Sequence, residues 1–273
     1  MMKCRSLLSM LLLLGACSGN DAVPAEGKEA VDTVGVPFID YTVVRSYPHD
    51  TALFTEGLLV HEGRLFESTG SPGDVPSAQS LVGSIDLKTG KMDKKVVLDR
   101  AKYFGEGIAF LKGKLYQLTY KTHTGFVYDA KTFRQLRSFH FDNAEGWGLT
   151  TDGEHLIMSD GSARLTYLSP DSLKPLKVLP VTEDGAPLQQ LNELEYIKGF
   201  IYANVWMSNA IVKIDPATGR VVGKLSLGSL DMEAKAKQRH PDVLNGIAYD
   251  AAQDKIYVTG KLWPNIYEIS FPH

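Results

Sequence analysis

Apolar and polar residues alternate along most of the chain in short runs, and turn residues separate these runs. Residues 107–110 and 115–117, for example, flank the turn Lys112-Gly113-Lys114. A period of two, with aromatic and β-branched residues at alternating positions, predicts half-buried β-strands. Turns such as residues 215–219, which contain Asp, Thr and Gly, suit hairpin connections. The pattern therefore predicts an all-β fold.

A short signature recurs five times, and each copy is expected to open the first strand of a repeat. The copies read Glu56-Gly57-Leu58, Glu106-Gly107-Ile108, Trp147-Gly148-Leu149, Asn192-Glu193-Leu194 and Asn245-Gly246-Ile247. A spacing of roughly 40–50 residues between repeats of short strands is typical of a β-propeller. Five repeats predict five blades. Since equivalent positions meet around one axis, the signature side chains should gather at one mouth of the central channel.

The last repeat ends too early to form a fourth strand of its own. Residues 41–45, which precede the first signature, have strand character. We expect this segment to supply the missing outer strand, which closes the ring and removes an exposed sheet edge. The polar insert at residues 232–239 has helix-forming composition and predicts a short helix or a lid, or else a solvated loop.

The N-terminus has the pattern of a targeting segment. Lys3 and Arg5 precede the apolar residues 7–14, and small residues lead to Cys17. This predicts a lipoprotein signal peptide at residues 1–16, with Cys17 as the lipidated first residue of the mature protein. The alternative is an ordinary signal with an incidental cysteine. The predicted location is the bacterial cell envelope, periplasmic or at the outer membrane.

Residues 17–37 are predicted to be a flexible linker, and residues 38–273 to be the propeller domain. Cys4 lies in the segment that would be removed, so no disulfide or thiolate metal site is expected. The net charge of −3 over 273 residues provides no basic field for nucleic acid. No stretch after residue 20 is long and apolar enough to span a bilayer. A closed ring with a polar surface favours a monomer.

The signature positions carry side chains that packing explains only in part. The glycines have a structural reason, because innermost strands crowd together. Glu56, Glu106 and Glu145 should approach one channel mouth from three blades. Carboxylates are seldom buried unless they are paired or take part in catalysis or binding. They could instead form a polar plug. Aromatic residues and Lys261 share this phase, and together they describe a small-molecule site.

These linked motifs resemble the plant and bacterial type of glutaminyl-peptide cyclotransferase over about residues 40–270. The runs that carry the resemblance are Phe54-Thr55-Glu56-Gly57-Leu58, Phe104-Gly105-Glu106-Gly107, Glu145-Gly146-Trp147-Gly148-Leu149-Thr150, Leu191-Asn192-Glu193-Leu194-Glu195-Tyr196, Leu244-Asn245-Gly246-Ile247-Ala248-Tyr249 and Val258-Thr259-Gly260-Lys261. The resemblance implies a five-bladed propeller enzyme that converts an N-terminal glutamine of a peptide or protein into pyroglutamate and releases ammonia.

Carried over by motif, the acid/base carboxylate of this family falls on Glu106. The reaction also needs donors to a developing oxyanion, for which Asn192 and Lys261 are the candidates. The expected substrate-binding positions are Phe54, Glu56, Phe104, Tyr120, Trp147 and Trp206. Tyr120 stands where relatives often have Trp, and the loop at residues 71–80 is unusual. No cofactor is expected to be required, but a structural cation in the channel is possible.

Two other functional classes stay open at this point. One is a non-catalytic, lipid-anchored propeller that binds or scaffolds at the cell envelope, because the fold does not determine the function. The other is a metal-dependent hydrolase or lactonase, which would need carboxylates and histidines around an ion. None of the histidines lies at the repeat position of the five signatures, which argues against the second class.

Overall fold

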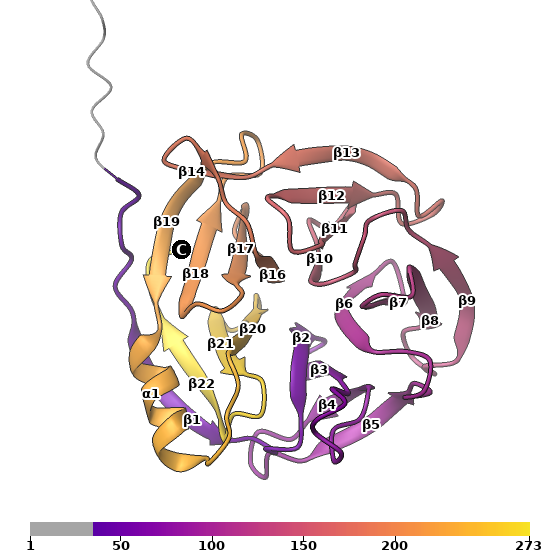
Figure 1. Cartoon of the computed structure of the whole chain (residues 1–273), viewed down its shortest axis with the longest axis horizontal. Helices are drawn as coiled ribbons and strands as arrows, with labels where there is room; N and C mark the ends of the chain where they lie inside the picture. The colour runs from indigo at the N-terminus through magenta and orange to yellow at the C-terminus, as the bar shows by residue number, and fades with distance from the viewer. Residues whose placement is uncertain (1–34) are drawn as a thin grey trace, which may run out of the picture. The chain divides into compact units, whose positions relative to one another are not determined.

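The computed structural model describes residues 35–273, and in this part of the chain the strands form five four-stranded antiparallel sheets around a central channel (Figure 1). Blade one contains β2 (Phe54–His61), β3 (Arg64–Gly70), β4 (Leu81–Ile85) and β5 (Met92–Val97). Blade two contains β6 (Gly105–Leu111), β7 (Lys114–Thr119), β8 (Thr124–Asp129) and β9 (Gln135–His140). Blade three contains β10 (Leu149–Thr151), β11 (Leu156–Ser159), β12 (Arg164–Leu168) and β13 (Pro175–Pro180). The predicted five-bladed propeller is confirmed.

The remaining elements belong to blades four and five and to their connections. Blade four contains β16 (Leu191–Ile197), β17 (Phe200–Val205), β18 (Ala210–Ile214) and β19 (Val221–Ser226). Blade five contains β20 (Leu244–Asp250), β21 (Lys255–Gly260), β22 (Asn265–Ser270) and β1 (Thr42–Pro48). A small hairpin of β14 (Thr182–Glu183) and β15 (Ala186–Pro187) joins blades three and four, and α1 (Gly228–Lys237) joins blades four and five.

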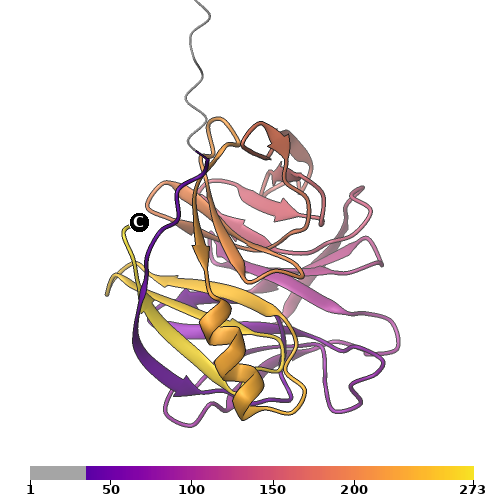
Figure 2. The same cartoon turned by 60° about the vertical axis from the view of Figure 1, so that its left-hand side comes forward.

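The N-terminal strand closes the ring as predicted. β1 pairs antiparallel with β22, so that Thr42 faces Ser270 and Pro48 faces Asn265 (Figure 2). The residues just before β1 lie along the edge of β19, where the Ile39 amide donates to the Lys224 carbonyl at 2.8 Å. Both contacts cover sheet edges that would otherwise be unpaired. Residues 1–16, Cys17 and most of the predicted linker lie outside the described residues.

The signature glycines allow neighbouring innermost strands to approach closely, as the repeat predicted. A Cβ atom at Gly107 would lie 2.6 Å from the Trp147 carbonyl oxygen of the next blade. A Cβ atom at Gly148 would overlap the carbonyl oxygen of Asn192 in the blade after that. Any side chain at these positions would push the inner strands apart, which explains why the signature needs glycine there.

Glu193 occupies the equivalent position in blade four and fills the channel instead. Its carboxylate accepts hydrogen bonds from the amides of Leu58 at 3.0 Å and Ile247 at 2.7 Å, so it joins three blades. Burial raises the pKa of Glu193 well above its usual range, and the two amide donors oppose that effect. Glu193 therefore acts as a polar plug of the channel, a role that the sequence analysis had considered only for Glu56, Glu106 and Glu145.

Helix α1 packs beside the blades through its apolar residues. Figure 2 shows the helix beside blade five, and Leu230 and Ala234 are buried in one cluster with Trp263 and Tyr267 of that blade. The helix begins four residues earlier than the predicted insert, and Leu230, one of these additional residues, is buried. Within residues 35–273, no helix has the length and apolarity that a membrane crossing requires.

Candidate functional site

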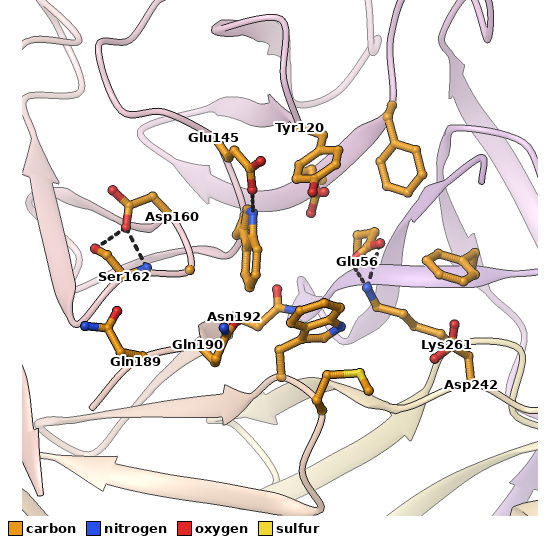
Figure 3. Close-up of a pocket in the computed structure, with 17 residues that line it drawn as sticks. Glu56, Tyr120, Glu145, Asp160, Ser162, Gln189, Gln190, Asn192, Asp242 and Lys261 are labelled. Atoms are coloured by element: carbon orange, nitrogen blue, oxygen red, sulfur yellow. Dashed lines mark hydrogen bonds and ion pairs between the residues drawn. The ribbon is translucent and has the colours of Figure 1, made fainter. Parts of the chain in front are cut away.

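A cavity of about 670 Å³ opens at one mouth of the channel (Figure 3). All nine side chains predicted to act in catalysis or substrate binding line it. They are Phe54, Glu56, Phe104, Glu106, Tyr120, Asn192, Trp147, Trp206 and Lys261. The repeat explains the convergence, because each residue lies at the start of a first strand or directly after a second strand. Hydrogen bonds between these segments hold the rim, as from the Tyr120 amide to the Phe104 carbonyl at 3.1 Å.

Glu106 lies on β6 at the floor of the cavity and is 4% exposed. Its carboxyl group makes no hydrogen bond to any residue in the described part of the chain, although its backbone carbonyl accepts one from the Ser68 hydroxyl at 2.6 Å. Burial raises the pKa of Glu106 well above its usual range, the Glu56 and Glu145 carboxylates raise it further, and Lys261 opposes them. Such a carboxyl group keeps its proton to a higher pH than an ordinary glutamate does.

Glu56 and Lys261 form a buried ion pair beside Glu106. The Lys261 ammonium contacts both carboxylate oxygens of Glu56, at 2.8 and 2.7 Å, and lies 4.8 Å from the centre of the Phe54 ring. Burial raises the pKa of Glu56 to about 7 even though Lys261 lowers it. The Asn245 amide nitrogen also donates to Glu56 at 3.3 Å. The ion pair therefore fixes one cation at a defined place in the cavity.

Aromatic rings form two groups around these charges. Phe104 meets Phe54 edge-on at 6.2 Å and Tyr120 at 5.8 Å, while Trp147 meets Trp206 edge-on at 5.6 Å. Glycines make space for the rings, since a Cβ atom at Gly161 would lie 2.8 Å from Trp147. The Trp147 indole nitrogen donates to Glu145 at 2.9 Å, which holds that ring in place. The result is an apolar enclosure with polar groups at defined points.

Asn192 brings an unpaired amide to the cavity (Figure 3). The residue is 3% exposed, and its Oδ1 atom is buried without a hydrogen-bond partner among residues 35–273. Its backbone carbonyl accepts from the Ser159 hydroxyl at 2.7 Å, so the main chain is fixed while the side-chain amide is not. An unsatisfied buried polar atom costs about 1–3 kcal/mol, so this amide is well placed to bind a ligand.

The cavity also contains residues that the sequence did not assign to the site. They are Asp160, Gly161, Ser162, Gln189, Gln190, Met207 and Asp242, whereas Glu145 lines the cavity at the mouth where the sequence analysis had placed it. A signal existed for Asp160, because it follows the second strand of blade three as Tyr120 and Lys261 follow theirs. Gln189 and Gln190 come from the irregular connection after β15, which has no counterpart in the other repeats. Repeat alignment could not have found them.

A search for metal-binding groups gave no candidate in the described part of the chain. Among residues 35–273, no three His, Cys, Asp or Glu side chains are grouped so that they could hold an ion.

Comparisons with known proteins agree with the geometry of the site. The family model described as glutamine cyclotransferase matches residues 10–271. The glutaminyl-peptide cyclotransferase of Arabidopsis thaliana is 41% identical over 229 residues, which cover 83% of this chain and 70% of that protein. The crystal structure of Myxococcus xanthus glutaminyl cyclase superposes with a TM-score of 0.78 at 34% identity, covering 86% of this chain and 98% of that one.

Proposed function

Because the chain belongs to the glutamine cyclotransferase family, we propose that it cyclises the N-terminal glutamine of a peptide or protein to pyroglutamate and releases ammonia, with Glu106 transferring the proton. The observation that carries the proposal is the Glu106 carboxyl group. It is buried, has a raised pKa, lines the cavity and has no hydrogen-bond partner in the described residues.

The reaction is an intramolecular acyl transfer, and its balance defines what the enzyme must supply. The α-nitrogen forms a bond to the side-chain amide carbon, and the bond from that carbon to the amide nitrogen breaks. The α-amine loses a proton, and the departing nitrogen gains one to leave as ammonia. A free α-amine has a pKa near 7.7–8.0, so part of it is already neutral at mild pH. The substrate provides its own nucleophile.

Glu106 carries the proton between the two nitrogens. As a carboxylate it accepts the proton from the attacking α-amine, and as the acid it donates the proton to the leaving nitrogen. A carboxyl group with a raised pKa is a stronger base than an ordinary glutamate and can return the proton as an acid, and such acid–base help is typically worth about 10²–10⁴-fold in rate. The lack of an internal partner leaves both carboxyl oxygens for the substrate.

Lys261 and Asn192 stabilise the charge that develops on the amide oxygen. The ammonium has three N–H groups, of which the contacts to Glu56 use two, so one donor remains. The Asn192 side chain supplies the second donor through its Nδ2 group, whereas its unpaired Oδ1 atom can only accept a hydrogen bond from the substrate. Donors of this kind are typically worth about 10²–10³ in turnover each. Glu56 acts by holding Lys261 in position.

The aromatic rings hold the glutamine side chain folded back toward its own amine. Phe54, Phe104 and Tyr120 cover one side of the cavity, and Trp147 and Trp206 cover the other. Holding reacting atoms close together reduces the entropy that the reaction must lose at its barrier. Excluding water also suppresses simple hydrolysis of the amide to glutamate.

Replacing Glu106 by Gln tests the proposal. The variant should fold with an unchanged melting temperature, because its carboxyl group makes no hydrogen bond within the described residues. Its cyclisation of a Gln-initiated peptide should fall by about 10²–10⁴-fold. Mass spectrometry of the peptide follows the loss of ammonia, and the exposed Glu154→Gln substitution is the matched control. If Glu106→Gln keeps turnover near that of the unchanged protein, Glu106 does not have this role. If the unchanged protein and Glu154→Gln cyclise the peptide but Glu106→Gln does not, the non-catalytic alternative is excluded.

The location of the enzyme is a separate proposal, and it rests on the N-terminal sequence. Cys17 would carry a lipid that anchors the propeller to the cell envelope, as a monomer that meets its substrates there. Acyl chains add membrane affinity without spanning the bilayer. Cys17→Ala should move the protein from the membrane fraction to the soluble fraction, and an unchanged distribution would contradict the anchor.

A further inference from the structure

A second cavity, of about 620 Å³, lies next to the catalytic cavity and shares with it Asp242, which Figure 3 labels. One wall is the loop at residues 74–77, which connects β3 to β4 in blade one. The other wall is the segment at residues 240–242, which leads from α1 into blade five. The two cavities are similar in volume, and the second has no part in the chemistry described above.

The wall formed by the loop is held in place by one side chain. The Arg100 guanidinium donates hydrogen bonds to the carbonyls of Pro76 at 2.6 Å, Pro72 at 2.9 Å, Ala78 at 2.9 Å and Val75 at 3.2 Å. Four bonds from a planar, permanently charged group fix the backbone of a loop that has no regular structure. This wall is therefore preformed, which lowers the entropic cost of binding a ligand.

The same loop also contacts the catalytic cavity. Ala78 is buried in a cluster with Phe54 and Leu262, and Val75 packs against that cluster. Phe54 lines the catalytic cavity and Leu262 lines the second one. One packed cluster thus contributes to the lining of both cavities, which places the two cavities side by side.

Two exposed carboxylates, those of Asp74 and Asp242, line the second cavity, and neither forms an ion pair within residues 35–273. The lining contains no Lys or Arg, and His240 is its one basic side chain. A third cavity of about 310 Å³ also has Pro241 and Asp242 in its lining, but there Asp231 already pairs with Lys235 at 2.7 Å. The second cavity is larger, and its carboxylates are available to a ligand.

We propose that the second cavity binds the second and third residues of the substrate peptide and favours Lys or Arg at those positions. The inference rests on the proposed function, since a peptide whose first residue fills the catalytic cavity must leave it through an open side. Asp242 lines both cavities, so the second cavity is the path assigned to that chain, and its two exposed carboxylates complement a cationic chain. The substrates are accordingly peptides that begin with glutamine followed by basic residues.

Three peptides of equal length test the inference: Gln-Lys-Lys-Ala, Gln-Ala-Ala-Ala and Gln-Glu-Glu-Ala amides. At low ionic strength, kcat/KM should be highest for the Lys peptide and lowest for the Glu peptide. Exposed ion pairs are worth up to about 1 kcal/mol, so each carboxylate should contribute about 2–5-fold. Asp74→Asn should lower the ratio of kcat/KM for the Lys peptide to kcat/KM for the Glu peptide by about that factor. Added salt should reduce this ratio further. The exposed Asp171→Asn substitution is the matched control and should leave the ratio unchanged.

A binding titration separates failure of the inference from failure of the proposed function. Tryptophan fluorescence would report binding of pyroglutamyl peptides with the same three tails, without any turnover. If the three tails bind and react equally, or if Asp74→Asn leaves the ratio unchanged, the inference is wrong and the proposed function stands. If no glutamine peptide is cyclised, the proposed function fails, and the order of affinities still decides whether the groove selects basic residues.

Discussion

Replacing Glu193 by Gln tests whether one side chain ties the blades together at the channel. Each carboxylate oxygen of Glu193 accepts one backbone amide, from Leu58 at 3.0 Å and from Ile247 at 2.7 Å. Glutamine keeps the size but has only one acceptor oxygen, so its NH₂ group faces one of the two amides. One buried donor then loses its acceptor, which costs about 1–3 kcal/mol. For a domain of this size, that corresponds to a fall in melting temperature of about 2–12 °C.

Two measurements check this reasoning on Glu193. Thermal and urea unfolding give the loss of stability, and Glu193→Ala should lose more than Glu193→Gln because both amides are left without an acceptor. Hydrogen exchange should show faster exchange at Leu58 or Ile247 in the variants. The exposed Glu154→Gln substitution is the matched control. A Glu193→Gln variant with unchanged stability and unchanged protection of both amides would refute the idea that the carboxylate is a structural tie between blades.

Three further predictions concern the charge on Glu106, a buried histidine and the closing strand. Glu145→Gln removes a negative charge that raises the pKa of Glu106. The acid limb of the profile of kcat/KM against pH should therefore move to lower pH. An unmoved limb would contradict the effect of the Glu145 charge on Glu106. His49 is buried and contacts Glu67 at 3.0 Å. Burial by itself would lower the pKa of His49, but the contacts of the ring, chiefly with Glu67, outweigh the effect of burial and raise that pKa above the usual 6.5. The bound proton therefore stabilises the fold below about pH 6.5, and this stabilisation disappears as the pH rises through the raised pKa. The melting-temperature difference between the unchanged protein and His49→Gln should shrink from pH 6 to pH 9, and a constant difference would count against a charged pair. Deleting residues 38–47 removes most of β1 and leaves the edge of β22 open, so the propeller should unfold or melt far lower; a truncated protein with the same melting temperature would disprove closure by this strand.

The architecture could be predicted from local sequence because a propeller repeats one local pattern. The alternation of residues predicted strands, the five signatures predicted five blades, and the short last repeat predicted closure by the N-terminal strand. The structure confirms all three. The repeat also placed nine side chains around one cavity, because residues at the same phase of a closed ring lie at the same end of its axis.

Other features of the site could not be predicted, because they depend on which residues meet across blades. Glu193 was visible in its signature, but only the structure shows that it bonds to β2 and β20. Arg100 lies more than twenty residues from the loop that it fixes, and nothing in its neighbourhood indicates that role. Gln189 and Gln190 enter the cavity from a connection outside the repeat.

The sequence by itself determined the number of blades, the strand that closes the ring and the end of the channel where the unusual side chains gather, since each follows from periodicity along the chain. The tertiary structure alone decided which of those side chains are paired. It placed Lys261 against Glu56, gave Glu193 two amide donors, and left the Glu106 carboxyl group and the Asn192 amide oxygen without partners among residues 35–273. The physical reason is that burial and hydrogen bonding, which set the pKa and availability of each group, depend on distances between residues far apart in sequence.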